Sequence, residues 1–175
     1  MTSATNKPAK PATVKSGTRS SGAGSKRSAA RLAAVQALYQ MKMTGASADS
    51  VIVQFCEQDA ARKWSEINPG EFDRGLFGQL VKGVTAKREE LDRIIGAVLS
   101  EDWTVERLEI ILRAILEAGT YEITERPDVP PRVAITEYVD VAHAFYSGAE
   151  PGMVNGVLDK LARKFRDQEM TAGRG

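Results

Sequence analysis

The sequence predicts an all-α protein of about seven helices, arranged as two small bundles and preceded by a disordered basic tail. Apolar residues recur at three- and four-residue steps along most of the chain after residue 25. Prolines and glycines interrupt that pattern as they do at helix ends, and no alternating strand pattern exceeds a few residues. We therefore expect a tail over residues 1–25 and one helical domain over residues 26–170.

The tail consists mostly of Ser, Thr, Ala, Gly, Pro and Lys, and Val14 is its one sizeable apolar residue. It cannot bury enough surface to offset the entropy lost on ordering. An organellar transit peptide is the alternative, but such peptides form amphipathic helices, and Pro8, Pro11 and three glycines argue against one. The sequence contains no secretory apolar region and no apolar run of the roughly 18 residues that span a membrane. We expect a cytoplasmic protein that makes no membrane contact.

Three helices are expected in the first half of the domain. The first covers about residues 28–43, and Gly45 provides its C-terminal stop. The second bears Val51, Phe55, Cys56 and Ala60. The segment Asn68-Pro69-Gly70-Glu71 combines an N-cap, a proline at the first helical position and a glutamate that can reach back to the cap. It predicts the start of a third helix, which carries Phe72, Leu76, Leu80 and Val84.

Four further helices are expected in the second half. The fourth covers about residues 91–98, and a long fifth helix begins after Thr104. Prolines interrupt the pattern at 127, 130 and 131, so a sixth helix begins at Pro131 and ends before Gly148. A seventh follows Pro151-Gly152 and runs through Phe165. Asn155-Gly156 is a hairpin signal in other contexts, but the helical period continues through it, so Gly156 is expected where another backbone approaches closely.

The sequence contains no recognisable catalytic constellation. Cys56 and His143 are the only residues of their types, which excludes an intrachain disulfide and a Cys/His zinc cluster. We interpret Cys56 as a core residue and His143 as a partly exposed one. Phosphate-binding glycine loops, paired-histidine metal helices and nucleophile elbows are absent. We therefore expect a protein that is not an enzyme and needs neither cofactor nor metal.

Positive and negative charges are unevenly distributed along the chain. The first 48 residues carry eight basic side chains and no acidic one, whereas the formal total is +1, so the remainder sums to −7. A local excess of Lys and Arg attracts nucleic acid through counterion release, whatever the total charge. The alternative is a solvated basic tail that binds nothing.

The start of the first helix carries the residue types that bind RNA. Lys26, Arg27 and Arg31 can contact phosphates, and Arg27 and Arg31 are four residues apart and so share a face. Gln36 can read a base edge, and Tyr39 can stack on an unpaired base. These residues together suit single-stranded RNA. For Tyr39 the alternative is a place in the core, because aromatic residues at helical spacing usually pack inward.

Several segments resemble one known family, the bacterial transcription antitermination factor NusB. The resemblance covers about residues 26 to 166. The segments that carry it are Ala34-Val35-Gln36-Ala37-Leu38-Tyr39, Ile111-Leu112-Arg113 with Tyr121-Glu122, Val129-Pro130-Pro131-Arg132-Val133-Ala134-Ile135 with Glu137, and Val154-Asn155-Gly156-Val157-Leu158-Asp159-Lys160. The order and spacing of these segments also agree with the family.

The resemblance implies a non-enzymatic role. NusB proteins bind boxA, a short single-stranded RNA element in ribosomal RNA leaders, as a heterodimer with the ribosomal protein NusE. The complex joins elongating RNA polymerase and suppresses premature termination. By position, the family's RNA contacts fall on Lys26, Arg27, Arg31, Tyr39, Arg113 and Met153.

Some of these positions depart from the family or allow another interpretation. Ser28 and Ala29 stand where many relatives have arginines, so the helix start is less positive. Met153 replaces a phenylalanine, in a shortened loop over residues 148–153, and cannot stack as an aromatic ring does. Arg113 could instead pair within its helix, with Glu109 or Glu117.

Two other functions are compatible with parts of the sequence. NusB-like domains also precede some RNA cytosine methyltransferases, but the chain ends at Gly175, and we expect no cofactor-binding domain. The stronger rival is a helical protein-interaction module whose basic tail only improves solubility. A preference for boxA-like RNA over a scrambled strand would distinguish a NusB-like RNA-binding protein from such a module.

Overall fold

The computed structural model describes residues 22–62 and 72–172. Within these ranges it contains helices and no strand, which confirms the all-α prediction. A 3-10 turn covers Val105–Arg107. The α-helices are α1 (Gly22–Thr44), α2 (Ala48–Arg62), α3 (Arg74–Gly96), α4 (Ile110–Glu125), α5 (Pro131–Phe145), α6 (Glu150–Phe165) and α7 (Asp167–Ala172).

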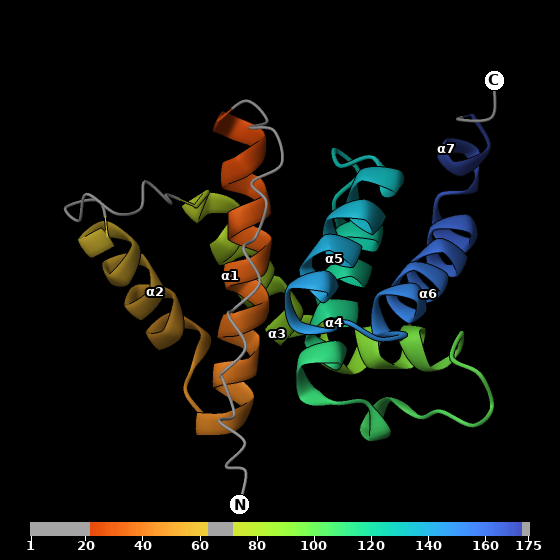
Figure 1. Ribbon diagram of the computed structural model, residues 1–175, viewed down its shortest axis with the longest axis horizontal. Coiled ribbons are helices and arrows are strands. Elements are labelled where there is room, and N and C mark those ends of the chain that lie inside the picture. Colours follow the sequence, from red (N-terminus) through yellow and green to blue (C-terminus); the bar gives the residue numbers. More distant parts are fainter. Residues whose placement is uncertain (1–21, 63–71, 173–175) are drawn as a thin grey trace, which may run out of the picture.

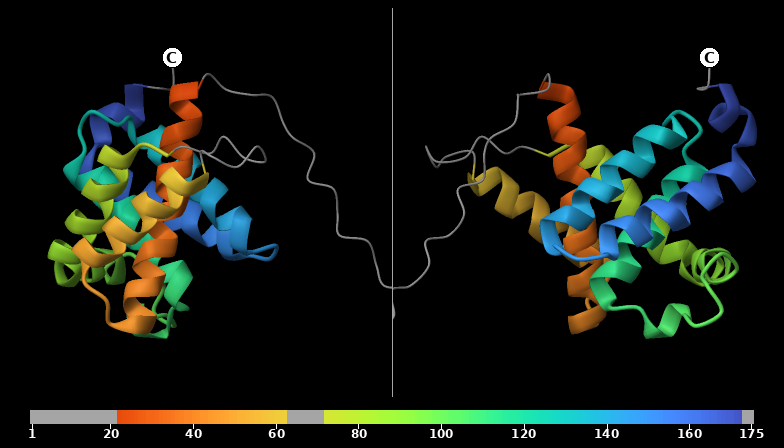
Figure 2. Two further views of the ribbon diagram at one scale, coloured as in Figure 1. Left: turned by 90° about the vertical axis from the view of Figure 1, so that its left-hand side faces the viewer. Right: turned by 45° about the vertical axis from the view of Figure 1, so that its right-hand side comes forward.

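The helices form two bundles that share one core. Helices α1, α2 and α3 pack on one another, and α4, α5 and α6 form the second group, with the short α7 against α5 and α6 (Figures 1 and 2). Helix α4 joins the groups because it packs against both α1 and α3. Tyr138 and Phe77, the largest fully buried side chains, belong to one continuous cluster that spans both bundles. None of the described helices is long and apolar enough to cross a membrane.

The third and fourth predicted helices are one helix, α3. Its buried residues Leu76, Leu80, Val84 and Leu91 keep one face across the charged stretch that separated the two predictions. The predicted N-cap at residues 68–71 lies outside the described residues. The helix starts later, because the carboxylate of Asp73 caps it by accepting a hydrogen bond from the Leu76 N–H at 2.9 Å. Phe72 therefore precedes the helix instead of belonging to it.

Other boundaries also differ from the predictions. Helix α1 begins at Gly22, so the described residues 22–25 are helical and not part of a tail. The long fifth helix begins at Ile110, after the separate 3-10 turn. Helix α6 begins at Glu150 with Pro151 in its first turn, so Met153 lies on a helix and not in a loop. Proline is tolerated there because backbone N–H groups in the first turn of a helix have no hydrogen-bond partner within the helix.

The close backbone approach expected at Gly156 is wrong. A Cβ atom added there would meet no atom within 4 Å, whereas one at Gly119 of α4 would lie 2.8 Å from Leu158 Cδ1. Gly119 is therefore a position where helix packing leaves no room for a side chain, as is Gly83 of α3, where an added Cβ would overlap Tyr121 Cζ. Gly119 lets α4 approach α6 and Tyr138 of α5.

Gly119→Ala should lower the free energy of unfolding by about 1–3 kcal/mol, because the added methyl group overpacks the contact with Leu158. Gly156→Ala is the matched control and should be neutral or stabilising, since Gly in an open helical position costs about 0.5–1 kcal/mol relative to Ala. Urea denaturation followed by circular dichroism measures both. Equal stability of the two variants would contradict the packing described here.

Candidate nucleic-acid interface

Arg31 lies in the interior, not on an RNA-facing surface. Its side chain is 4% exposed, and its guanidinium donates to both carboxylate oxygens of Glu122, at 2.8 and 2.9 Å. A second carboxylate, that of Glu137, is 3.4 Å from it. The four-residue spacing predicted that Arg31 shares a phosphate-binding face with Arg27. That expectation does not agree with this burial, because the charge of Arg31 is used within the fold.

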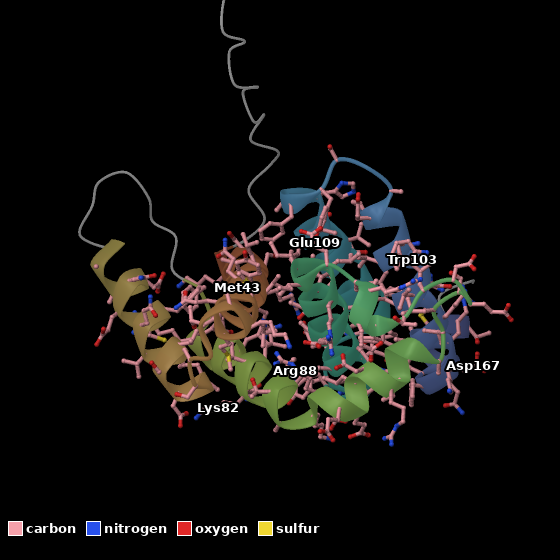
Figure 3. The ribbon with its side chains drawn as sticks, turned by 90° about the horizontal axis from the view of Figure 1, so that it is seen from below. Met43, Lys82, Arg88, Trp103, Glu109 and Asp167 are labelled. Carbon is pink, nitrogen blue, oxygen red and sulfur yellow. The ribbon has the colours of Figure 1, made fainter. Side chains whose placement is uncertain are left out.

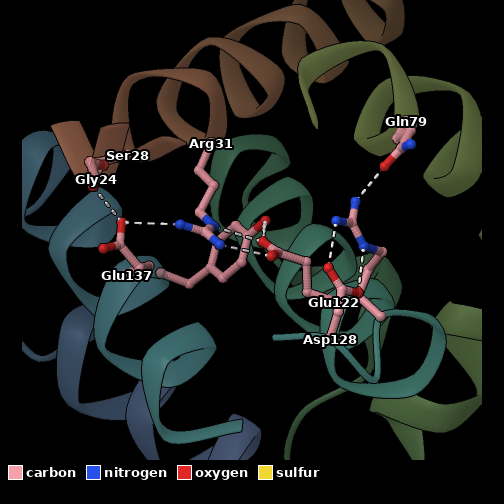
Figure 4. A network of polar contacts seen from close by, with 9 residues as sticks. Gly24, Ser28, Arg31, Gln79, Glu122, Asp128 and Glu137 are labelled. Carbon is pink, nitrogen blue, oxygen red and sulfur yellow. Dashed lines mark hydrogen bonds and ion pairs between the residues drawn. The ribbon is translucent and has the colours of Figure 1, made fainter. Parts of the chain in front are cut away.

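The carboxylate of Glu122, whose contacts with Arg31 are drawn in Figure 4, has a further donor, the hydroxyl of the fully buried Tyr138. Burial raises the pKa of Tyr138 well above its usual value, and the charge and hydrogen bond of Glu122 add to that rise. Burial alone would lower the pKa of Arg31, but the hydrogen bond and charge of Glu122 outweigh it and raise that pKa. Arg31 therefore stays charged at any ordinary pH, and its contacts with Glu122 and Glu137 join α1 to α4 and α5.

The start of α1 leaves two cations on the surface. Lys26 and Arg27 are exposed, one turn before Arg31 becomes buried. The backbone at this end is fixed, because the Asp73 N–H donates to the Lys26 carbonyl at 3.1 Å. Beside it lies a cavity of about 220 Å³, lined in part by Arg27, Arg31, Gln79 and Arg126. Sequence reasoning missed Arg126, because nothing in the sequence indicates that it meets the start of α1.

Gln36 and Tyr39 share the outward face of α1. Both are exposed, with 37% of Tyr39 accessible, so a place in the core for that ring is wrong. They are three residues apart and so are neighbours on the helix surface. Gln36 lies nine residues after Arg27, or about 14 Å along the axis at 1.5 Å per residue. At about 3.6 residues per turn, nine residues also place Gln36 on roughly the opposite side of the helix from Arg27. A strand that contacts both places therefore has to cross over α1.

Arg113 carries a positive charge that its neighbours offset. It donates to Glu117 at 3.2 Å and forms a hydrogen-bonded ion pair with Asp92 of α3. The intrahelical pair with Glu117 was predicted from the sequence as the alternative to an RNA contact. With its side chain only 23% exposed, Arg113 presents little unbalanced charge to a ligand.

Glu117 is the most perturbed carboxyl group of this cluster. Burial raises its pKa to about 7, and a hydrogen bond with Asp92 adds to the rise. The charges of Arg88 and Arg113 act in the opposite direction but do not cancel it. Because the cluster packs α3 against α4, its titration bears on stability.

Met153 lies in a different region. It is half-buried in the first turn of α6 and lines a groove of about 610 Å³ with Trp103, Arg107 and Lys160. Figure 3 shows Trp103 with Met43 on the face seen from below, whereas α1 begins at the top of Figure 1. The predicted RNA contacts are therefore not one patch. Lys26 and Arg27 lie together, Gln36 and Tyr39 lie further along α1, and Arg113 and Met153 lie elsewhere.

The fold and this surface define a class: a helical protein of two bundles whose first helix presents cations at its start. Residues 28–163 match the model of the NusB family. The chain belongs to that family.

Comparisons with individual proteins support this family membership. Transcription antitermination protein NusB of Rhodospirillum rubrum is 46% identical over 164 residues, covering 83% of this chain and 88% of that protein. The solved structure of T. maritima NusB matches with a TM-score of 0.66 and 24% identity, covering 83% of this chain and 96% of its own. A crystal structure of antitermination factors NusB and NusE in complex with dsRNA matches with a TM-score of 0.65, 21% identity and coverage of 79% and 96%. The solved structures establish a shared fold.

Arg31→Met should lower the free energy of unfolding by about 3–5 kcal/mol, because it leaves Glu122 buried without its counter-charge. Arg163→Met is the matched control. It breaks an exposed 2.8 Å pair with Asp159 and should cost less than about 1 kcal/mol. Urea denaturation at pH 7 measures both losses. Similar small losses would show that the Arg31–Glu122 pair does not hold the bundles together.

Glu117 should make stability depend on pH. Its pKa is about 7 when folded and 4.5 ordinarily, so the folded protein takes up a proton between these values that the unfolded chain does not. This contribution is complete below pH 4.5 and is lost as pH rises through about 7. The fall in unfolding free energy between pH 5 and pH 8 should therefore be smaller in Glu117→Gln than in the wild type. The exposed control Glu89→Gln should keep the wild-type profile, and identical profiles for all three proteins would contradict the assignment.

Proposed function

We propose that this protein is a transcription antitermination factor that binds single-stranded boxA-type RNA of ribosomal RNA leaders together with NusE. In this role the complex joins elongating RNA polymerase and prevents premature termination without catalysing a reaction. Support comes from family membership and from relatives named transcription antitermination protein NusB. One chain of a solved complex of NusB, NusE and double-stranded RNA has the same fold as this protein, which supports RNA and NusE as the partners.

The observation that carries the proposal is the cationic start of α1. Lys26 and Arg27 are exposed there, next to a cavity lined by further arginines. Exposed Gln36 and Tyr39 lie further along the same helix, on another side of it from Arg27, and the Tyr39 ring offers a face to an unpaired base. This supports a single strand, because bases in a duplex are already stacked.

The other predicted contacts have separate roles in the proposal. Arg31 acts indirectly, by holding α1 in place through Glu122. Arg113 and Met153 stay predictions from the family resemblance, and their surroundings add no support. Arg113 is paired with two carboxylates, and Met153 lies in the groove beside Trp103.

Arg27→Ala should weaken binding to a boxA-like single strand and flatten its salt dependence by about 0.7 in the log–log slope, the value for one phosphate contact. Fluorescence anisotropy with NusE present, over a series of salt concentrations, measures both quantities. Arg93→Ala removes an exposed arginine from the far end of α3 and is the matched control, which should bind as the wild type does.

A scrambled strand tests the function itself. The wild-type protein should prefer the boxA-like strand, as base contacts require. Equal, weak binding to both strands would instead favour a helical protein-interaction module with a basic tail.

A further inference from the structure

We propose that the cavity between Arg27 and Arg126 binds a backbone phosphate of the RNA strand, and that Asp128 competes with this phosphate for Arg126. The proposal rests on the proposed function, because the strand is the one bound at the start of α1. It adds a contact from the turn between α4 and α5, a segment far from α1 in the sequence.

The cavity lies where three elements end. Arg27 comes from the start of α1, Gln79 from the first turns of α3, and Arg126 directly follows α4. Its volume of about 220 Å³ is several times the roughly 30 Å³ that a water molecule occupies in the liquid, so a phosphate group fits. It is continuous with the exposed surface of Arg27, along which the strand runs in the proposed function.

Two of its cations are available to a ligand. Of the four charged residues that line it, Arg31 is committed to Glu122, and Asp73 caps α3. Arg27 and Arg126 remain. Arg27 is exposed and makes no hydrogen bond or ion pair with another described residue, although its charge acts on Asp128.

The guanidinium of Arg126 has more N–H donors than its contacts use. It donates to the two carboxylate oxygens of Asp128 at 3.0 and 2.9 Å, and to the side-chain oxygen of Gln79 (Figure 4). A guanidinium has five N–H donors, so two of those on Arg126 are not used by these contacts. A phosphate in the cavity can accept from them and from Arg27 at once.

Asp128 shows that this position holds an anion. Its hydrogen bond from Arg126 lowers its pKa to about 2, and the charges of Arg126 and Arg27 contribute. Guanidinium forks that bind carboxylates in this two-pronged geometry also match phosphates. The Asp128 side chain is 62% exposed, so it can swing away towards water when a phosphate takes its place.

The segment that carries both residues is held in position. The guanidinium of Arg166, at the end of α6, donates to the carbonyls of Val129 at 2.6 Å and Pro127 at 3.1 Å. Little backbone entropy is therefore lost when the phosphate binds. Only the Arg126 and Asp128 side chains need to adjust.

Two substitutions with opposite expected effects test the proposal. Arg126→Ala should weaken binding to the boxA-like strand about tenfold, as loss of a charge-assisted hydrogen bond implies, and reduce the salt slope by about 0.7. Asp128→Asn should tighten binding, because it removes a negative charge that both repels the phosphate and occupies Arg126. Anisotropy titrations of the full chain with NusE measure both, and thermal unfolding confirms that each variant is folded.

The opposite signs separate phosphate binding from a structural role. If the Arg126–Asp128 pair only stabilised the turn, both substitutions would weaken binding, and that result would overturn the proposal. Unchanged affinity in both variants would overturn it as well. Arg163→Ala and Asp159→Asn alter a comparable exposed pair on α6, away from the cavity, and should leave the affinity unchanged. Effects of equal size in this control pair would show a general charge effect instead.

The same titrations distinguish this proposal from the function on which it rests. If the wild type binds the boxA-like strand and Arg126→Ala binds equally well, the phosphate site fails and the proposed function stands. If the wild type shows no preference for that strand, the proposed function fails, and the phosphate site fails with it.

Discussion

The buried ion pair between Arg31 and Glu122 is the constraint on which the arrangement of the molecule depends. Two charges in a protein interior are costly to desolvate, and this cost is offset only by good geometry and additional hydrogen bonds. Both conditions are met here by the two-pronged contact and by the donor from Tyr138. Because the three residues come from α1, α4 and α5, the pair fixes how the first helix crosses the second bundle.

That constraint decides which cations face the solvent. With Arg31 turned inward, α1 presents Lys26 and Arg27 just where its buried part begins. Elsewhere in the described residues many arginines are matched by nearby acids, as Arg113 is by Asp92 and Glu117. The sequence as a whole is almost neutral, yet the start of α1 keeps an excess of positive charge. Electrostatic attraction of a polyanion therefore has a defined place on the surface, and the helix holds its donors in fixed positions.

Much of the fold could be predicted from the sequence, because apolar periodicity directly reports helix faces. The charged stretch inside α3 hid its continuity, since a run of Lys, Arg and Glu interrupts the apolar count while favouring helix. The site was harder to predict. Spacing alone gave Arg27 and Arg31 a common face, but whether that face is buried depends on Glu122, 91 residues away from Arg31. Arg126 could not be found at all, because only the folded chain brings it to α1.

Amide chemical shifts can locate the RNA strand on the protein, and so show whether it lies at the start of α1. The full chain with NusE is titrated with a boxA-like single strand, and shift changes are followed residue by residue. We expect the largest changes at Lys26 and Arg27 and in the turn that carries Arg126, with little change around Trp103. Changes confined to the groove beside Trp103, with none at the start of α1, would contradict this expectation.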